Sequence, residues 1–223
     1  MAEEAEVPLV GGWVTAGVVR VAETVRRPRT ANAPFVASLL RHLESVGFEG
    51  APRYLGTDHQ GRDVLTFSEG VVPSDTREIV WADEQLAAAA RLLRRFHDAT
   101  AGSDLAAKDA EVVCHNDFGP WNLVWVEQHP VAVIDFDEAA PGSRLDDLGY
   151  AVWKHLNLGL IDLPVAEQAR RMKVMASAYD VTADATLVDA IDRAQARMER
   201  RICSSEQLAG ERRWLEENGA ELT

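Results

Sequence analysis

Cysteine is scarce in this chain of 223 residues, which contains only Cys114 and Cys203. Neither cysteine has the neighbours or the spacing of a metal-binding motif, so we expect no disulfide framework and no zinc site. No run of eighteen apolar residues occurs, which argues against a membrane-spanning helix. The opening residues, MAEEAEVPLV, lack the basic residues of secretory signals and transit peptides. These absences predict a soluble, cytoplasmic protein that does not associate with membranes.

Basic residues are also fewer than acidic ones: the chain has 23 lysines and arginines but 36 aspartates and glutamates, which gives a net charge of -13. This balance disfavours a nucleic-acid partner, whose phosphates would be repelled. It would attract a small cationic substrate, although an acidic surface is equally common in soluble enzymes that bind no cation. The sequence gives no indication of the oligomeric state.

The apolar residues that are present, 47% of the chain, are enough to bury a sizeable core. Short β-rich runs separated by turns predict five strands before about residue 70, and residues 34–48 have the apolar spacing of one helix. Beyond that point the pattern is mostly helical, over 83–100 and again from Leu148 nearly to the end. We therefore predict an α+β fold of two lobes. A small antiparallel β lobe with one helix spans residues 1–69, and a larger, mostly helical lobe spans residues 70–223.

The most informative stretch begins HNDFGPWN at His115 and continues through two short apolar runs, LVWV and VAVI, separated by EQHP. Such a pair of β-branched runs predicts an antiparallel hairpin. If its turn is symmetric about residues 127–130, Asn122 and Asp135 lie opposite each other at the open end. Their Cβ atoms would then be roughly 5 Å apart, which is close enough to share one ion.

A carboxylate and an amide oxygen are ligands that Mg²⁺ accepts, with phosphate oxygens and water filling its other positions. Asp117 lies on the loop just before Asn122, where it could accept the proton of an attacking hydroxyl. Together these groups indicate phosphoryl transfer. Two alternatives stay open: an ordinary hairpin with polar ends, and a metal-dependent hydrolase of phosphate esters. The hydrolase would lack a second His and Asp cluster for a two-metal site.

These residues resemble the aminoglycoside phosphotransferase family, whose relatives include choline kinases and protein kinases. The resemblance lies in His115-x-Asp117-(x4)-Asn122, then Ile134-Asp135-Phe136, then Asp147-Leu148. The GPWN sequence in the loop, and the lack of a long activation segment after it, favour the small-molecule branch. The resemblance implies a bilobal protein kinase-like fold. It also implies transfer of the γ-phosphoryl group of ATP or GTP, with Mg²⁺, to a hydroxyl of a small cationic molecule such as an aminoglycoside or amino alcohol.

The resemblance also implies a role for each site residue. Asp117 would be the catalytic base, braced by His115, while Asn122 and Asp135 would hold Mg²⁺. Asp147 would support the catalytic loop, or would simply cap the helix that follows it. Further residues implied at the site are Thr66 and Ser68 beside the adenine, and Asp137, Glu138 and Asp146, which could bind a cationic substrate or a second metal, or lie in solvent.

Three features depart from this family pattern. The third strand of the fold usually supplies a phosphate-binding lysine, but here it reads Val-Arg-Arg-Pro. Strand alternation puts Arg26 and Arg27 on opposite faces; we favour Arg26 in the cleft, with Arg27 as the alternative. The next helix has no glutamate near residues 36–38, and the glycine-rich loop is reduced to Gly11 and Gly12, which could equally form a plain β-turn. The alternative function is therefore a nucleotide-binding pseudokinase with little or no turnover.

Overall fold

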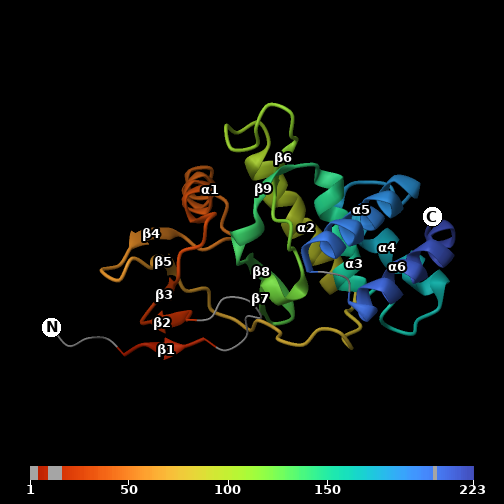
Figure 1. Cartoon of the computed structure of the whole chain (residues 1–223), viewed down its shortest axis with the longest axis horizontal. Coiled ribbons are helices and arrows are strands. Elements are labelled where there is room, and N and C mark those ends of the chain that lie inside the picture. Colours follow the sequence, from red (N-terminus) through yellow and green to blue (C-terminus); the bar gives the residue numbers. More distant parts are fainter. Residues whose placement is uncertain (1–4, 10–16, 203–204) are drawn as a thin grey trace.

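The computed structural model describes residues 5–9, 17–202 and 205–223. Figure 1 shows the strand-rich N-terminal elements at one end of the molecule and most of the helices at the other. In these described ranges, no helix combines the length and the apolar character needed to cross a bilayer. The predicted α+β arrangement, with a sheet-rich part followed by a larger helical part, is confirmed.

Five strands form one antiparallel sheet in the order β1-β2-β3-β5-β4. The strands are β1 (Val7–Pro8), β2 (Val19–Val21), β3 (Thr24–Arg27), β4 (Tyr54–Thr57) and β5 (Asp63–Thr66). Central strand β3 lies between β2 and β5, which places its two arginines on opposite faces of the sheet. The prediction of five strands ahead of residue 70 is confirmed.

Helix α1 (Ala33–Ser45) is the one helix among the described residues of this N-terminal part. It has a proline in its first turn, where a missing N–H costs nothing. It ends just before Gly47, whose φ of 75° is the left-handed conformation that favours glycine after a helix. Leu39, Leu40 and Leu43 are fully buried and join the hydrophobic core that continues into the helical part.

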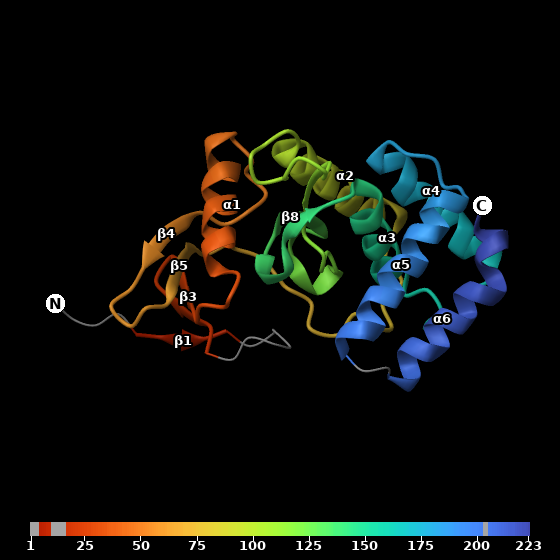
Figure 2. The same ribbon diagram turned by 45° about the horizontal axis from the view of Figure 1, so that its top comes forward.

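In the described residues of the C-terminal part, five α-helices surround two short strand pairs. The helices are α2 (Asp83–Thr100), α3 (Arg144–Leu156), α4 (Val165–Tyr179), α5 (Ala185–Ile202) and α6 (Glu206–Asn218). Helix α5 packs along α3, as Figure 2 shows, and α2 packs against α4. Strand β6 (Val112–Cys114) pairs with β9 (Ala140–Gly142) and so closes the loop that carries the predicted base.

The predicted hairpin is present, as β7 (Leu123–Val126) and β8 (His129–Val133). Its turn consists of two residues, not four, because Glu127 and Gln128 both have positive φ, 47° and 66°. This is the geometry of a type I′ turn, whose twist matches that of the strands it joins. This turn could not be predicted from residue type, since neither residue is a glycine or an asparagine.

The register at the open end of the hairpin differs from the predicted one. It shifts between Val124 and Trp125, and beyond the shift the carbonyl of Asn122 accepts a hydrogen bond of 2.9 Å from the N–H of Ile134. The prediction that Asn122 lies opposite Asp135 is therefore wrong by one residue. Asp135 lies just past the paired strands, in the left-handed conformation with φ 62°.

Candidate active site

The carboxylate of Asp117 is held from both sides. It lies on the loop between β6 and the short 3-10 helix Pro120–Asn122. The Asn122 amide nitrogen donates to Asp117 Oδ2 at 2.9 Å and also to the Asp117 carbonyl oxygen at 2.9 Å. The Tyr150 hydroxyl, from the buried face of α3, donates to Asp117 Oδ1 at 2.5 Å. The half-buried carboxylate is thus oriented before any substrate binds.

Asp135 lies beside an arginine of the N-terminal sheet. Arg27 Nη2 is 3.1 Å from Asp135 Oδ1 and 2.6 Å from Asp137 Oδ2. Arg27 is only 8% exposed, so this guanidinium links the sheet to the segment after β8 from a largely desolvated position. Burial raises the pKa of Asp137 even though Arg27 is adjacent.

Arg26 faces away from this site, so the expectation that it lies in the cleft is wrong. Its Nη1 donates to Thr24 Oγ1 at 2.5 Å, and its Nε lies 3.9 Å from Asp58. Strand alternation correctly puts Arg26 and Arg27 on opposite faces of β3, but the face that turns toward Asp135 is the one that carries Arg27. The cleft-facing arginine is Arg27, which was the alternative.

Asp147 is completely buried and holds the start of the loop that carries Asp117. Its Oδ2 accepts from the His115 N–H at 2.7 Å and from His97 Nε2 at 3.0 Å, and its Oδ1 accepts from the Asn116 N–H at 2.8 Å. Burial alone would raise the pKa of Asp147, but these hydrogen bonds hold it below the usual value. Asp147 does not cap its helix: α3 begins at residue 144, and Ser143 is the N-cap.

His115 is buried between the loop and the hairpin. One ring nitrogen, Nε2, contacts the Ile134 carbonyl oxygen at 3.0 Å, and the other, Nδ1, accepts from the Asp117 N–H at 3.3 Å. Both ring nitrogens are therefore engaged with backbone. His115 joins the residue before Asp135 to the residue that would be the base.

The residues predicted to bind the nucleotide are less clearly placed. The N–H of Thr66 donates to the Arg53 carbonyl, and its hydroxyl accepts from the Arg53 N–H at 2.8 Å. The N–H and the hydroxyl of Thr66 therefore form hydrogen bonds within the sheet and are not free to bind an adenine. Ser68 lies two residues past the end of β5. Gly11 and Gly12 lie outside the described residues.

Comparison with known proteins gives a consistent result. The sequence model described as "Phosphotransferase enzyme family" (APH) matches residues 100–184, which include the loop, the hairpin and α3. The trifolitoxin immunity protein of Rhizobium leguminosarum bv. trifolii is 36% identical over 194 residues, covering 79% of this chain and 71% of that protein. The chain belongs to the APH phosphotransferase family. This membership supports a phosphotransferase that acts on a hydroxyl group of a small molecule.

Solved structures of similar shape agree with the fold. The phosphotransferase is similar to APH(2″)-IIa in its gentamicin complex, with a TM-score of 0.62 at 14% identity, covering 98% of this chain and 93% of that one. It is similar to aminoglycoside 2′-phosphotransferase-IIIa in its GDP complex, with a TM-score of 0.60 at 14% identity, covering 100% and 95%. It is also similar to an ethanolamine kinase of Plasmodium vivax, with a TM-score of 0.58 at 12% identity, covering 91% and 77%. The bilobal kinase-like fold of this phosphotransferase is thereby shown.

The three acids predicted to bind a substrate are all engaged in ion pairs of 2.6 Å. Asp137 pairs with Arg27, Glu138 with Arg201, and Asp146 with Arg193. The last two arginines come from α5, where Arg193, Arg197 and Arg201 recur every fourth residue and so share one face. Sequence reasoning missed this row, although its spacing was visible. It also missed Tyr150.

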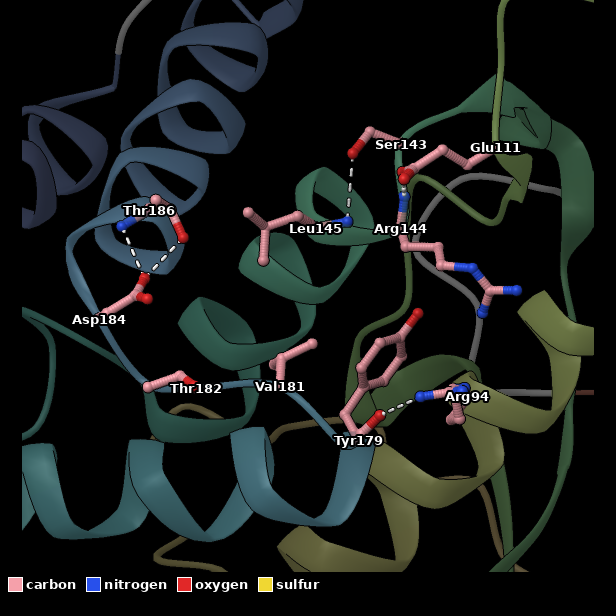
Figure 3. Close-up of a pocket in the computed structure, with 10 residues that line it drawn as sticks. All are labelled: Arg94, Glu111, Ser143, Arg144, Leu145, Tyr179, Val181, Thr182, Asp184 and Thr186. Carbon is pink, nitrogen blue, oxygen red and sulfur yellow. Dashed lines mark hydrogen bonds between the residues drawn. The ribbon is translucent and has the colours of Figure 1, made fainter.

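A cavity lies away from these groups. It has a volume of about 620 Å³ and is lined by residues from α2, from the start of α3 and from the α4–α5 connection, including Arg94, Tyr179 and Thr186. Figure 3 shows two local contacts at its edges: Arg94 donates to the Tyr179 carbonyl oxygen on one side, and Thr186 donates to Asp184 on the other. None of the predicted site residues lines this cavity, which offers no group comparable to the oriented Asp117 carboxylate.

One buried group has the spacing of a metal site: His97, Cys114 and Asp147 lie within 4.8 Å of one another through their ligand atoms. Each of them already has a partner. His97 bonds to both Tyr179 and Asp147, and the Cys114 thiol donates to the Ser143 carbonyl oxygen at 3.2 Å. Burial raises the pKa of Cys114 far above its usual value, so its thiolate is disfavoured. The cluster is hydrogen-bonded and supports the loop that carries Asp117.

Proposed function

We propose that this protein transfers the γ-phosphoryl group of ATP, or GTP, to a hydroxyl of a small molecule, with Asp117 as the catalytic base. The observation that carries the proposal is the Asp117 carboxylate, oriented by Tyr150 and Asn122 next to the segment that bears Asp135. Residues 1–69 would form the nucleotide-binding lobe and residues 70–223 the lobe that binds the acceptor. Dependence on a nucleoside triphosphate also favours a cytoplasmic location.

The residues present fit a divalent cation. Asn122 uses its amide nitrogen on Asp117, which leaves the amide oxygen available to a metal. Asp135 is partly exposed and contributes a carboxylate, and hard oxygen ligands of this kind suit Mg²⁺ with a nucleotide supplying further ligands. When bound between Asn122 and Asp135, the ion would neutralise charge on the β- and γ-phosphates.

The transfer itself requires one bond to form and one to break. The acceptor oxygen bonds to the γ-phosphorus as the bond from that phosphorus to the β,γ-bridging oxygen breaks, and the electron pair leaves with the nucleoside diphosphate. The hydroxyl proton passes to the Asp117 carboxylate. The hydrogen bonds from Tyr150 and Asn122 keep the carboxylate in one orientation, so that positioning supplies part of the rate.

Arg27 takes the place of the missing phosphate-binding lysine in this proposal. The family pattern would pair that lysine with a glutamate of α1, but Val36 and Ala37 are buried apolar residues at the corresponding turn. Here the acidic partner is Asp137, which is 110 residues further along the chain. An arginine held by Asp137 and touching Asp135 is placed to bind phosphate oxygens through its planar fork.

Replacing Arg27 with methionine should weaken ATP binding by about 10- to 100-fold, because a buried, charge-assisted hydrogen bond to phosphate is lost. Isothermal titration with a non-hydrolysable ATP analogue measures the change. Arg26→Met is the matched control, since this neighbour faces Thr24 and Asp58 and should bind the analogue almost as wild type does. An equal loss of affinity in both variants would contradict the assignment of Arg27 as a phosphate-binding residue.

Thermal melting tests the metal site. Mg-ATP at a hundredfold excess over its Kd should raise the melting temperature of the wild type by roughly 5–10 °C, because it binds only the folded chain. ATP with EDTA, or Mg-ATP with Asp135→Ala, should give a much smaller rise. A rise in the variant equal to that of the wild type would contradict the assignment of Asp135 as a metal ligand.

The acceptor is the least defined part of the proposal. The structural relatives include proteins described with gentamicin and as an ethanolamine kinase, which favours the cationic acceptor expected from the sequence. Likeness to an immunity protein favours an acceptor that is toxic and is inactivated by phosphorylation. The loop acids Asp137, Glu138 and Asp146, however, would each have to exchange an arginine for an amine.

The alternative function, a nucleotide-binding pseudokinase, draws support from the altered phosphate site. Against it stands the oriented carboxylate of Asp117, since a protein that only binds nucleotide needs no base. ATP consumption that depends on Asp117 would exclude the pseudokinase.

A further inference from the structure

The surroundings of Asp117 on α3 and α5 are cationic. Tyr150 and Lys154 are one helical turn apart on α3, so they share the face that meets the catalytic loop. Helix α5 lies alongside α3 (Figure 2) and brings Arg197 and Arg201 close enough to act electrostatically on the Tyr150 hydroxyl. Three positive charges therefore lie near the carboxylate that would accept the proton.

Lys154 is poorly compensated for a lysine with little exposure. Its side chain is 18% exposed, and its Nζ lies 3.3 Å above the ring of Trp153. The nearest carboxylate oxygen, on Glu211, is 3.8 Å away, and the other oxygen of that carboxylate accepts from Gln207. Desolvation lowers the pKa of Lys154 to about 8, although Glu211 and Asp117 both act to raise it. An anion reaching this lysine would relieve the imbalance.

Arg197 also has capacity for a further acceptor. Its Nη1 donates to Asn116 Oδ1 at 2.7 Å, and its guanidinium carbon lies 6.0 Å from the centre of the Tyr150 ring. Its Nη2 is buried and has no hydrogen-bond partner among the described residues. A buried guanidinium nitrogen without an acceptor is costly, and a carboxylate oxygen would satisfy it.

No loop acid balances these charges for an incoming amine. Glu138 and Asp146 already pair with arginines of α5, and Asp137 pairs with Arg27. A polycation approaching Asp117 would meet the positive charges of Lys154 and Arg197, and of the nearby acids Glu211 already lies 3.8 Å from Lys154. Like-charge contacts of this kind reject a ligand as effectively as favourable contacts select one.

We propose that the acceptor carries a carboxylate or another anionic group near its hydroxyl, and that Lys154 and Arg197 bind this group. The inference rests on the proposed function, because Asp117 marks where the hydroxyl must lie. It departs from the cationic acceptor expected from the sequence. Lys154 and Arg197 are specificity residues in this scheme: they select the acceptor, and Asp117 takes its proton.

A matched set of sugars tests the charge preference by binding. Glucuronate, glucose and glucosamine differ mainly in whether they carry an acid, no charge or an amine. Each is added to the full chain with Mg-ADP at equal ionic strength, with sodium acetate as a control for simple anions, and melting is recorded. Glucuronate is expected to bind at least about tenfold more tightly than glucose, the size of one charge-assisted hydrogen bond. Glucosamine and gentamicin should bind more weakly than glucose.

Variants distinguish binding of glucuronate at a specific site from attraction by the overall positive charge of α5. Lys154→Met and Arg197→Met should each reduce the preference for glucuronate to threefold or less. Arg193→Met, which removes a charge of the same helix that pairs with Asp146, should keep it. Because Lys154→Met leaves the buried Glu211 carboxylate without its lysine, this variant is expected to melt lower than wild type, and Mg-ADP binding equal to that of the wild type is used to show that each variant is folded in the assay. No preference for glucuronate, a preference for glucosamine or gentamicin, or an unchanged preference in both variants would overturn the inference.

Turnover with Mg-ATP and the same compounds is measured in parallel and tests the proposed function separately. Binding of glucuronate that depends on Lys154, without ATP consumption, would support the anionic acceptor and count against catalysis. ATP consumption driven by glucosamine or gentamicin would support catalysis and reject the anionic acceptor.

Discussion

Replacing Asp117 with asparagine should lower phosphoryl transfer by about 10²- to 10⁴-fold, the usual contribution of a positioned general base. An amide cannot accept the hydroxyl proton. It can, however, keep the local hydrogen bonds, because its oxygen can accept from Asn122 while its nitrogen donates to the Tyr150 hydroxyl oxygen. The variant should therefore fold, melt and bind Mg-ATP much as the wild type does, with the loss confined to kcat.

Tyr150→Phe is the matched control for this prediction. It removes the 2.5 Å hydrogen bond to Asp117 Oδ1 but leaves the base itself in place. Its turnover should fall less than that of the Asp117 variant, since orientation is weakened and proton acceptance is retained. Single-turnover measurement of labelled phosphate separates this loss from slow product release. If Asp117→Asn were as fast as wild type, the base would have to be another group.

Much of the site could be predicted because its signals are local. The strand that ends at Cys114, the loop that follows it and the hairpin after Asn122 are each set by a few consecutive residues. The spacing of Asp117, Asn122 and Asp135 was therefore enough to propose them as candidates. The one-residue error at Asp135 has two causes. The two-residue turn, in which Glu127 and Gln128 adopt left-handed conformations, moves the partner of Asn122 back by two residues, and the register shift between Val124 and Trp125 moves it forward again by one.

The parts that could not be predicted depend on contacts between distant segments. Alternation along β3 separates Arg26 from Arg27, but which face meets the helical part is decided by packing. The partner of Arg27 lies 110 residues away, so no local pattern could show that Asp137 would take the place of a glutamate in α1. The ion pairs from α5 to Glu138 and Asp146 have the same origin. Because of these ion pairs, Glu138 and Asp146 are already bound to arginines and are not free to bind a ligand.

Replacing Asp147 with alanine should reduce the free energy of unfolding by about 3–5 kcal/mol, as expected for removing one partner of a buried charged network. The N–H groups of His115 and Asn116 and the ring of His97 would lose their common acceptor in a place that water does not reach. Asn116 has a positive φ of 64°, and the substitution removes the hydrogen bond from its N–H that stabilises this conformation. Urea unfolding measures the change.

The adjacent Asp146→Ala is the matched control, because its ion pair with Arg193 is largely exposed and should be worth at most about 1 kcal/mol. The pH dependence of the unfolding free energy further distinguishes Asp147→Ala from Asp146→Ala. Since the pKa of Asp147 is lowered from 3.8 on folding, its contribution is complete above that pH and is lost as the pH falls through the folded value. The stability difference between wild type and Asp147→Ala should therefore be constant near neutral pH and should narrow in acid. A loss of less than about 1 kcal/mol, equal to that of the Asp146 variant, would show that the catalytic loop holds its shape without Asp147.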